Sequence, residues 1–170
     1  MSLESPRELL IHELGDMLSA EHIISKMLPE LAKESQHPEL KSAFSDHLAE
    51  TKEQVKRLEQ AFKELGESPE ETTCYATEGL KKEHESLHEE KPSAGVLQMA
   101  NLLGASKTEH YEIASYQGLA QLAKDLGEST VADLLKENLA EEEAMAKRLT
   151  AFSKELGKNV KSAEKTQAKA

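Results

Sequence analysis

Glutamates that fall within apolar helical stripes are the residues of this chain whose types and spacing could do chemistry. Glu109 and Glu112 are three residues apart in the segment KTEHYEIASY, and Ile113, Tyr116 and Leu119 continue an apolar stripe beyond them. This spacing places both carboxylates on one face of a helix. Ionised carboxylates that converge in a helical core repel one another and lose hydration. Protonation, buried Arg or Lys, or multivalent cations could compensate, and a pair of divalent metal ions does so most completely.

Four long segments of helical periodicity would position these side chains. We expect helices over residues 6–35, 38–65, 93–126 and 129–156, and a shorter polar helix in the connection between Pro69 and Pro92. Ser5 and Pro6 are typical of a helix start, and Gly66, Gly127 and Gly157 of helix stops. Pro29 is expected to kink the first helix or end it early. The prediction is an all-α four-helix bundle of residues 1–157 with a crossover helix between helices two and three, followed by a polar, fraying tail of residues 158–170.

The chain also repeats itself with a constant separation of 91 positions. Four short motifs share this register: LAK at Leu31 and Leu122, LAE at Leu48 and Leu139, KRL at Lys56 and Lys147, and KELG at Lys63 and Lys154. Helices one and two therefore look like a copy of helices three and four. The same shift relates Glu21 to Glu112 and Glu50 to Glu141, so each half offers one glutamate in each of its helices.

This symmetry selects the candidate metal ligands. They are the four related glutamates, the additional Glu109, and His47, for which a hydrogen-bonded core histidine is an equal alternative: Glu21, His47, Glu50, Glu109, Glu112 and Glu141. Oxygen ligands with some imidazole suit iron or manganese, whereas glutamates alone also suit magnesium or calcium. Glu137, Glu142 and Glu143 fit a solvated face, and it stays open whether Glu53, His110 or Glu142 joins the set. His84 and His88 have a spacing that can bind a metal adventitiously, although a solvated face is the expectation.

The segments HLAETKEQVKRLEQ, KTEHYEIASYQGLA and LLKENLAEEE resemble ferritin-like di-iron carboxylate proteins of the YciE/YciF type, called a ferroxidase family. The resemblance covers about Leu9 to Leu156, and EHYEIASY is its most specific part. It implies a ferritin-like bundle in which Glu50 and Glu141 bridge two metals. Glu21 and Glu112 would be the other core ligands, and Glu109 an additional one. The usual histidine three residues after each bridging glutamate is Glu53 in one half and Ala144 in the other, and His47 could replace a missing imidazole.

The resemblance further implies two iron ions per bundle, with manganese or another divalent cation as the alternative, and oxidation of Fe(II) by oxygen or peroxide for iron detoxification under stress. No catalytic residue is assigned. Two other functions stay open: a non-enzymatic dimeric stress or structural protein, and a manganese catalase-like peroxide scavenger. By analogy with ferritin-like bundles we expect a homodimer.

Composition limits the partners and the location. The formal net charge of -11 argues against nucleic acid, whose phosphates call for a basic patch. The single cysteine, Cys74, excludes an intrachain disulfide and a cysteine-based zinc site. Charged residues interrupt the first 20 positions, and no apolar run approaches the length of a membrane span. We therefore expect a cytoplasmic protein without a membrane partner.

Overall fold

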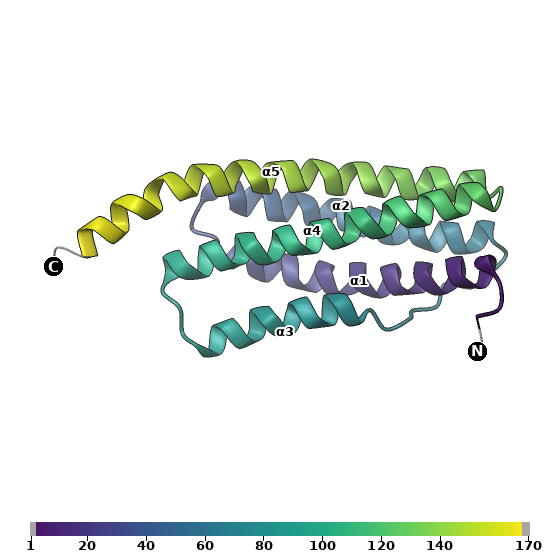
Figure 1. Cartoon of the computed structure of the whole chain (residues 1–170), viewed down its shortest axis with the longest axis horizontal. Coiled ribbons are helices and arrows are strands. Elements are labelled where there is room, and N and C mark those ends of the chain that lie inside the picture. The colour runs from purple at the N-terminus through teal and green to yellow at the C-terminus, as the bar shows by residue number, and fades with distance from the viewer. Residues whose placement is uncertain (1–2, 168–170) are drawn as a thin grey trace.

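Four long helices form an antiparallel bundle in the computed structural model, and a fifth, shorter helix lies on its outside (Figure 1). The structure describes the backbone of residues 3–167 and the side chains up to residue 158. Its helices are α1 (Pro6–Glu34), α2 (Pro38–Glu64), α3 (Tyr75–Glu89), α4 (Ala94–Asp125) and α5 (Ser129–Gln167). No strand occurs among the described residues. The predicted all-α bundle with a crossover helix is therefore confirmed.

The bundle consists of two helical hairpins. α1 packs on α2 and α4 on α5, while contacts of α2 with α5 and of α1 with α4 close the four-helix core. Each hairpin has a short connection, whereas the chain between the hairpins is long and contains α3. α3 contacts only α1 and α4, so it covers one side of the bundle without entering the core (Figure 1).

Local sequence signals set most helix ends. The Ser5 hydroxyl accepts a hydrogen bond from the Glu8 amide, and the Glu8 carboxylate accepts one from the Ser5 amide, so α1 begins with a capping box. Gly66 and Gly127 follow α2 and α4 with φ of 74° and 82°, a left-handed conformation that costs glycine little.

α1 ends close to the predicted residue, whereas the expected end of the last helix at Gly157 does not occur. α1 continues through Pro29 to Glu34, and α5 continues through Gly157 to Gln167. Gly157 is not among the glycines with positive φ, so the backbone does not turn left-handed there. The expected helix end at Gly157 is therefore wrong, and the last three positions of the predicted tail lie outside the described residues.

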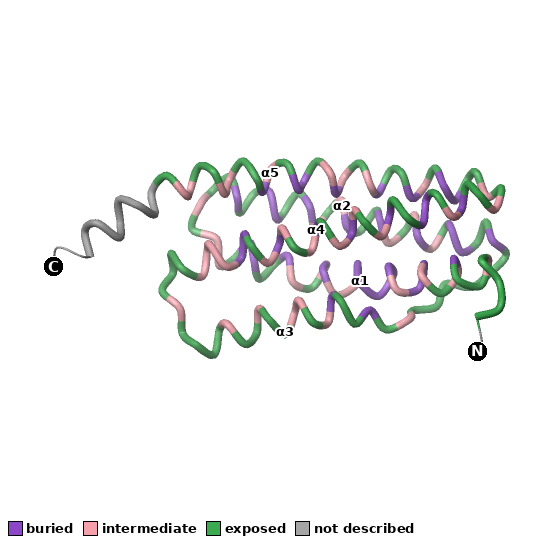
Figure 2. The backbone as a smooth tube through the Cα atoms, viewed as in Figure 1, coloured by how far each residue is buried: buried purple, intermediate pink, exposed green. Residues whose placement is uncertain are grey.

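A polar layer divides the core into two apolar clusters. In α1 it lies between Leu18 and Ile24, and in α5 between Leu135 and Met145. One cluster is built around Leu14, Leu58, Phe62, Leu119 and Leu135, and the other around Ile24, Leu28, Phe44, Leu102, Met145 and Leu149. Figure 2 shows buried positions along the inward sides of the four long helices, and few on α3. The apolar clusters thus hold the helices together on both sides of the polar layer.

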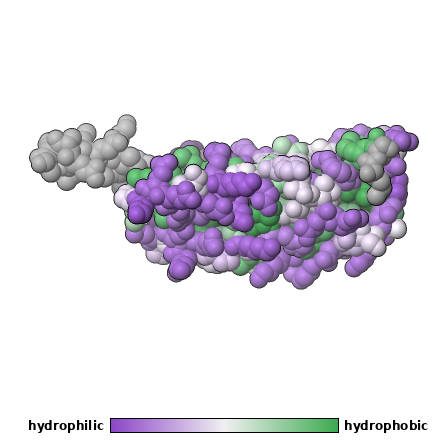
Figure 3. Space-filling view, turned by 90° about the horizontal axis from the view of Figure 1, so that it is seen from below, coloured by the Kyte–Doolittle hydropathy of each residue, from purple (hydrophilic) through white to green (hydrophobic). Residues whose placement is uncertain are grey.

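The outside of the molecule is mainly polar. Hydrophilic side chains predominate on the face drawn in Figure 3, with small apolar areas between them. Among the described residues, no helix combines the length and the apolar character needed to cross a bilayer.

Candidate metal centre

Five ionisable side chains meet in the polar layer, and all five are at most 3% exposed. Glu21 comes from α1, His47 from α2, Glu109 and Glu112 from α4, and Glu142 from α5. Each takes the place of an apolar residue in the inward stripe of its helix, so rotating it into water would expose the whole stripe. The helices that form the two apolar clusters therefore hold these groups at the centre of the bundle.

The five side chains form two groups of three that share Glu142. His47, Glu109 and Glu142 make one group, and Glu21, Glu112 and Glu142 make the other. In each group one ligand atom from every residue lies within 4.8 Å of the others. Ligands on opposite sides of a bound divalent ion are separated by about 4 Å, so each group could hold one ion. A shared carboxylate would join two adjacent ions.

Most potential ligand atoms in this layer lack a hydrogen-bond partner, although His47 Nε2 lies 3.5 Å from Glu109 Oε1 and 3.4 Å from Glu142 Oε2. Buried side-chain atoms without a hydrogen-bond partner among the described residues include Glu21 Oε2, His47 Nε2, Gln54 Oε1, Glu109 Oε2, both carboxylate oxygens of Glu112, and Glu142 Oε2. Outside the layer, Asn101 Oδ1 is the further such atom in the described part of the chain. Because buried polar groups are normally paired, a cluster of unpaired ones is a candidate site for a cation.

Burial and mutual repulsion change the proton affinities of these groups. Burial raises the pKa of Glu21, Glu109 and Glu112 well above the ordinary carboxyl value, and the negative charge of Glu142 raises each further. Burial alone would lower the pKa of His47, but the carboxylates of Glu142, Glu50 and Glu109 raise it well above its usual range. Without metal, protons therefore compensate part of the negative charge, and a metal ion would have to displace them.

Uncharged donors hold Glu21 in place. The Tyr116 hydroxyl donates a short hydrogen bond to Glu21 Oε1 and accepts one of 3.1 Å from the Asn138 amide. Burial raises the pKa of Tyr116 well above its ordinary value, and the charge of Glu21 raises it further, so this hydroxyl keeps its proton. Glu21 therefore has one oxygen fixed by Tyr116 and one oxygen, Oε2, without a partner.

A second set of contacts holds Glu141 away from the centre. Arg57 binds its two oxygens at 2.7 and 2.8 Å in a bidentate ion pair, and Gln54 Nε2 donates to it at 3.0 Å. The same Gln54 nitrogen donates a short hydrogen bond to Glu142 Oε1. The Glu141 side chain is 25% exposed, so its charge is neutralised by Arg57 at the edge of the bundle.

The sequence-predicted ligands therefore divide in two. Glu21, His47, Glu109 and Glu112 lie together in the layer, as their pattern indicated. Glu50 and Glu141 belong to neither group of potential ligands, and the expectation that both lie inward is wrong. The Glu50 side chain is 41% exposed, and its carboxylate contacts His47 Nδ1 at 3.0 Å, on the side of the ring away from the two groups.

Three residues were left open by the sequence. Glu53 is exposed and pairs with Lys56, and His110 is exposed with its ring bound to the Ser106 carbonyl. Glu142, by contrast, is fully buried at the centre and does not lie on a solvated face.

Helical spacing alone could have identified Glu142. It follows Leu135 by seven residues and precedes Met145 by three and Leu149 by seven, so it continues their buried stripe. The repeat instead favoured Glu50 and Glu141, which are related by the shift but lie at the edge of the bundle. The first-half counterpart of Glu142 is Thr51, which is also fully buried, so the two halves keep the same inward position but fill it differently.

A cavity of about 210 Å³ leads to the layer from the side covered by α3. Most of its lining is apolar and comes from α1, α3 and α4. Glu109 is part of this lining, as are His84 of α3 and Asn101 of α4. A small molecule in the cavity could therefore approach the group formed by His47, Glu109 and Glu142.

Comparison with known proteins supports both the fold and its relationship to YciF. Protein YciF of Escherichia coli (strain K12) is 38% identical over 151 residues, which are 88% of this chain and 91% of that protein. The crystal structure of the E. coli stress protein YciF has a TM-score of 0.86 at 36% identity and covers 92% of this chain and 99% of that chain. YcfI of Rhodopseudomonas palustris, described as a putative structural protein, has a TM-score of 0.85 at 36% identity over 88% of this chain and 95% of that one.

A more distant structure shares the fold alone. It is a dodecameric thioferritin, the bacterioferritin-related protein from Bacteroides fragilis, with a TM-score of 0.68 at 19% identity over 91% of this chain and 90% of that one. The predicted resemblance to proteins of the YciF type is therefore confirmed, and the thioferritin shares the fold of the bundle. Residues 5–161 match the model of a family described as "Domain of unknown function (DUF892)". The chain thus belongs to the DUF892 family.

Proposed function

We propose that this protein binds two divalent metal ions in the polar layer and oxidises Fe(II) there. The observation that carries the proposal is the pair of buried three-residue groups that share Glu142. In this assignment His47 and Glu109 would hold one ion, Glu21 and Glu112 would hold the other, and Glu142 would be available to both. Glu50 and Glu141 are left out of the ligand set, because neither contributes an atom to the two groups.

The charges of the chosen ligands fit two divalent ions. Glu21, Glu109, Glu112 and Glu142 supply four negative charges when ionised, and two divalent ions supply four positive ones. Neutral His47 adds a nitrogen ligand without changing this sum. Because an uncompensated charge in a protein interior is costly, the balance favours two ions over one or three.

The donor set favours iron over alkaline-earth ions. Carboxylates with one imidazole suit Fe and Mn, whereas Mg²⁺ and Ca²⁺ are bound by oxygen ligands alone. Ferritin-like di-iron proteins also place carboxylates and histidines of facing helices in the bundle core. The likeness to a protein described as a thioferritin, and to one described as a stress protein, supports iron oxidation as a response to stress.

The protein would contribute ligands, their orientation and a dry route of access. When bound, two Fe(II) ions would supply the two electrons that, with two protons from solvent, reduce oxygen to hydrogen peroxide or hydrogen peroxide to water. Tyr116 orients Glu21 and Gln54 orients Glu142 through hydrogen bonds. The apolar cavity that reaches Glu109 admits small uncharged molecules more readily than anions, which suits either oxidant.

Adjacent residues of α5 provide a matched test. Glu142→Gln removes the bridging carboxylate, whereas Glu141→Gln removes the neighbouring carboxylate that is paired with Arg57. Under anaerobic conditions, wild type and Glu141→Gln should bind the same number of Fe(II) ions, and Glu142→Gln should bind two fewer. If Glu142→Gln binds as many ions as wild type, the ligand assignment is wrong.

Oxidation is tested separately by following Fe(III) formation after oxygen or peroxide is added. Wild type and Glu141→Gln should oxidise Fe(II) faster than buffer, and Glu142→Gln should not. If wild type binds two ions but oxidises iron no faster than buffer, the metal-site assignment stands and the oxidation reaction is refuted. Metal analysis of protein purified without added metal would reveal manganese if that is the native ion. The homodimer and the cytoplasmic location stay predictions, which light scattering and cell fractionation can test.

A further inference from the structure

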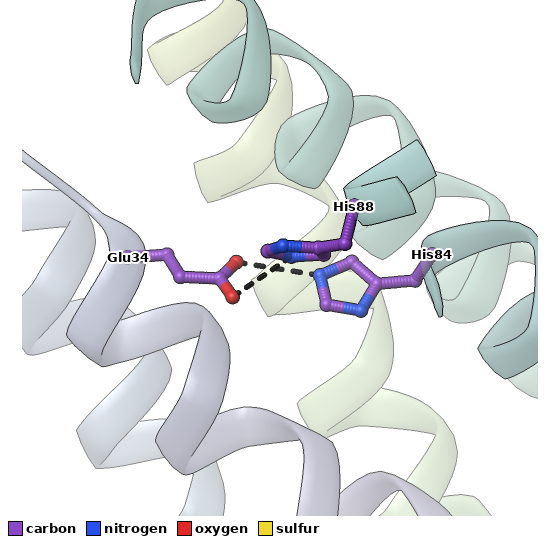
Figure 4. Close-up of side chains that lie close together, drawn as sticks. All are labelled: Glu34, His84 and His88. Carbon is purple, nitrogen blue, oxygen red and sulfur yellow. Dashed lines mark hydrogen bonds and ion pairs between the residues drawn. The ribbon is translucent and has the colours of Figure 1, made fainter. Parts of the chain in front are cut away.

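We propose that Glu34, His84 and His88 form a separate mononuclear site for a divalent transition metal. The three side chains join the C-terminal end of α1 to the crossover helix α3 (Figure 4). The proposal is independent of the dinuclear centre, since the two sites share no ligand.

The geometry brings one nitrogen from each histidine to the same carboxylate. His84 Nε2 lies 3.3 Å from Glu34 Oε2, and His88 Nε2 lies 2.9 Å from Glu34 Oε1. The histidines are four residues apart on α3, so both rings project from one face of the helix toward α1, as Figure 4 shows. One ligand atom from each of the three residues lies within 4.8 Å of the others. This arrangement needs only a small contraction to hold an ion.

Asn101 of α4 adds a second, independent indication. Its side-chain nitrogen donates a 2.7 Å hydrogen bond to Glu34 Oε2 and thereby orients the carboxylate. Its oxygen, Oδ1, has no partner among the described residues although Asn101 is only 2% exposed. Buried amides that hydrogen-bond a ligating carboxylate are typical supports of metal sites. An unpaired amide oxygen beside the same carboxylate could accept a hydrogen bond from a metal-bound water.

The ligand types determine which ions fit. Two imidazoles and one carboxylate favour Zn²⁺, Fe²⁺ or Co²⁺ over Mg²⁺ and Ca²⁺, which prefer oxygen alone. Three protein ligands leave at least one coordination position free for water or a small ligand. His84 and Asn101 also line the 210 Å³ cavity, which provides room beside the site for such a ligand.

Zn²⁺ titration followed by NMR of the imidazole nitrogens tests this site without interference from the dinuclear centre, because each histidine is observed individually. In the full-length wild type, the His84 and His88 signals should shift together and saturate with the same Kd, in the micromolar range or below. His84→Ala and His88→Ala should each weaken binding at the remaining histidine by about 100-fold or more, and Asn101→Ala by about 10-fold.

His22 provides the control, because it pairs with one carboxylate, Glu71 at 2.8 Å, and has no second histidine beside it. Its signal should not shift in the concentration range that saturates His84 and His88, and His22→Ala should leave their affinity unchanged. The site is refuted if His84 and His88 respond independently of each other, or only at the millimolar Zn²⁺ that also shifts His22. An unchanged affinity in Asn101→Ala would refute the positioning role of that amide.

Discussion

Replacing Glu112 with glutamine should stabilise the metal-free protein and weaken the metal-bound one. Both oxygens of this carboxylate are buried without a hydrogen-bond partner among the described residues, and the charges of Glu142 and Glu21 repel it. In Glu112→Gln the amide group has nearly the same volume, is neutral without taking up a proton and can donate hydrogen bonds to those two neighbours. The same change removes a ligand of the second metal ion.

The size of both effects follows from the burial of this side chain, which is 0% exposed. Satisfying buried groups that lack partners contributes about 1–3 kcal/mol, so the apo variant should gain roughly 2 kcal/mol. Each metal site adds about 4 kcal/mol to the unfolding free energy when free metal is 1,000 times its Kd. Two sites therefore stabilise wild type by about 8 kcal/mol, whereas the variant reaches about 6 kcal/mol from one site and its apo gain.

Thermal unfolding with and without metal measures these differences. For a chain of this length 1 kcal/mol corresponds to about 2–4 °C in Tm. The variant should melt roughly 4–8 °C above wild type in chelator and several degrees below it at saturating Fe(II) under anaerobic conditions. Glu64→Gln, at an exposed position of α2, is the control and should change neither value by more than about 2 °C.

The two conditions also separate the alternatives. A lower Tm of Glu112→Gln in chelator would mean that the carboxylate stabilises the apo layer, and the argument from repulsion would be wrong. If the Tm of Glu112→Gln is above that of wild type at saturating metal as well as in chelator, Glu112 is not a ligand.

Two further predictions concern pH and packing. Because the pKa values of Glu21, Glu109 and Glu112 are raised in the folded state, the apo protein should gain stability as the pH falls toward the ordinary carboxyl value of 4.5. The metal-bound protein should lose stability over the same range, because protons displace the ions. Plots of Tm against pH, measured with chelator and with metal, should therefore have slopes of opposite sign. At Gly15 an added Cβ would lie 2.6 Å from the Glu70 carbonyl oxygen, so Gly15→Ala should lower the free energy of unfolding by about 1–3 kcal/mol in chemical denaturation. Gly118 in α4 has open space around it, so Gly118→Ala should raise the free energy of unfolding by about 0.4–1 kcal/mol. Equal effects of the two substitutions would contradict the close packing of α1 on the crossover segment.

The helices and the burial of Glu21 and Glu112 were predictable because they depend on periodicity and on the repeat. A buried stripe recurs every three or four residues, and a 91-residue register adds an independent check on each position. The end of α5 was not predictable from Gly157 alone, since a glycine ends a helix only where the backbone turns left-handed.

The buried position of Glu142 was missed because neighbouring positions on a helix point about 100° apart. Glu141 and Glu142 are both acidic, so composition cannot tell them apart, and the repeat favoured the wrong one. What separates them in the structure is tertiary contact: Arg57 binds Glu141 at the edge of the bundle, and Glu142 continues inward. The distance between α2 and α5 that permits this ion pair is not encoded in either helix alone.

Positions that the repeat relates carry different types of residue in the two halves of the chain, so one half cannot substitute for the other. The first hairpin gives the layer one carboxylate and one imidazole, from Glu21 and His47, and the second gives three carboxylates, from Glu109, Glu112 and Glu142. A bundle of two first hairpins would have only two carboxylates for two divalent ions, and a bundle of two second hairpins would have six. Neither pairing balances the charge of two ions, so an ancestral duplication could reach this site only after its copies had diverged.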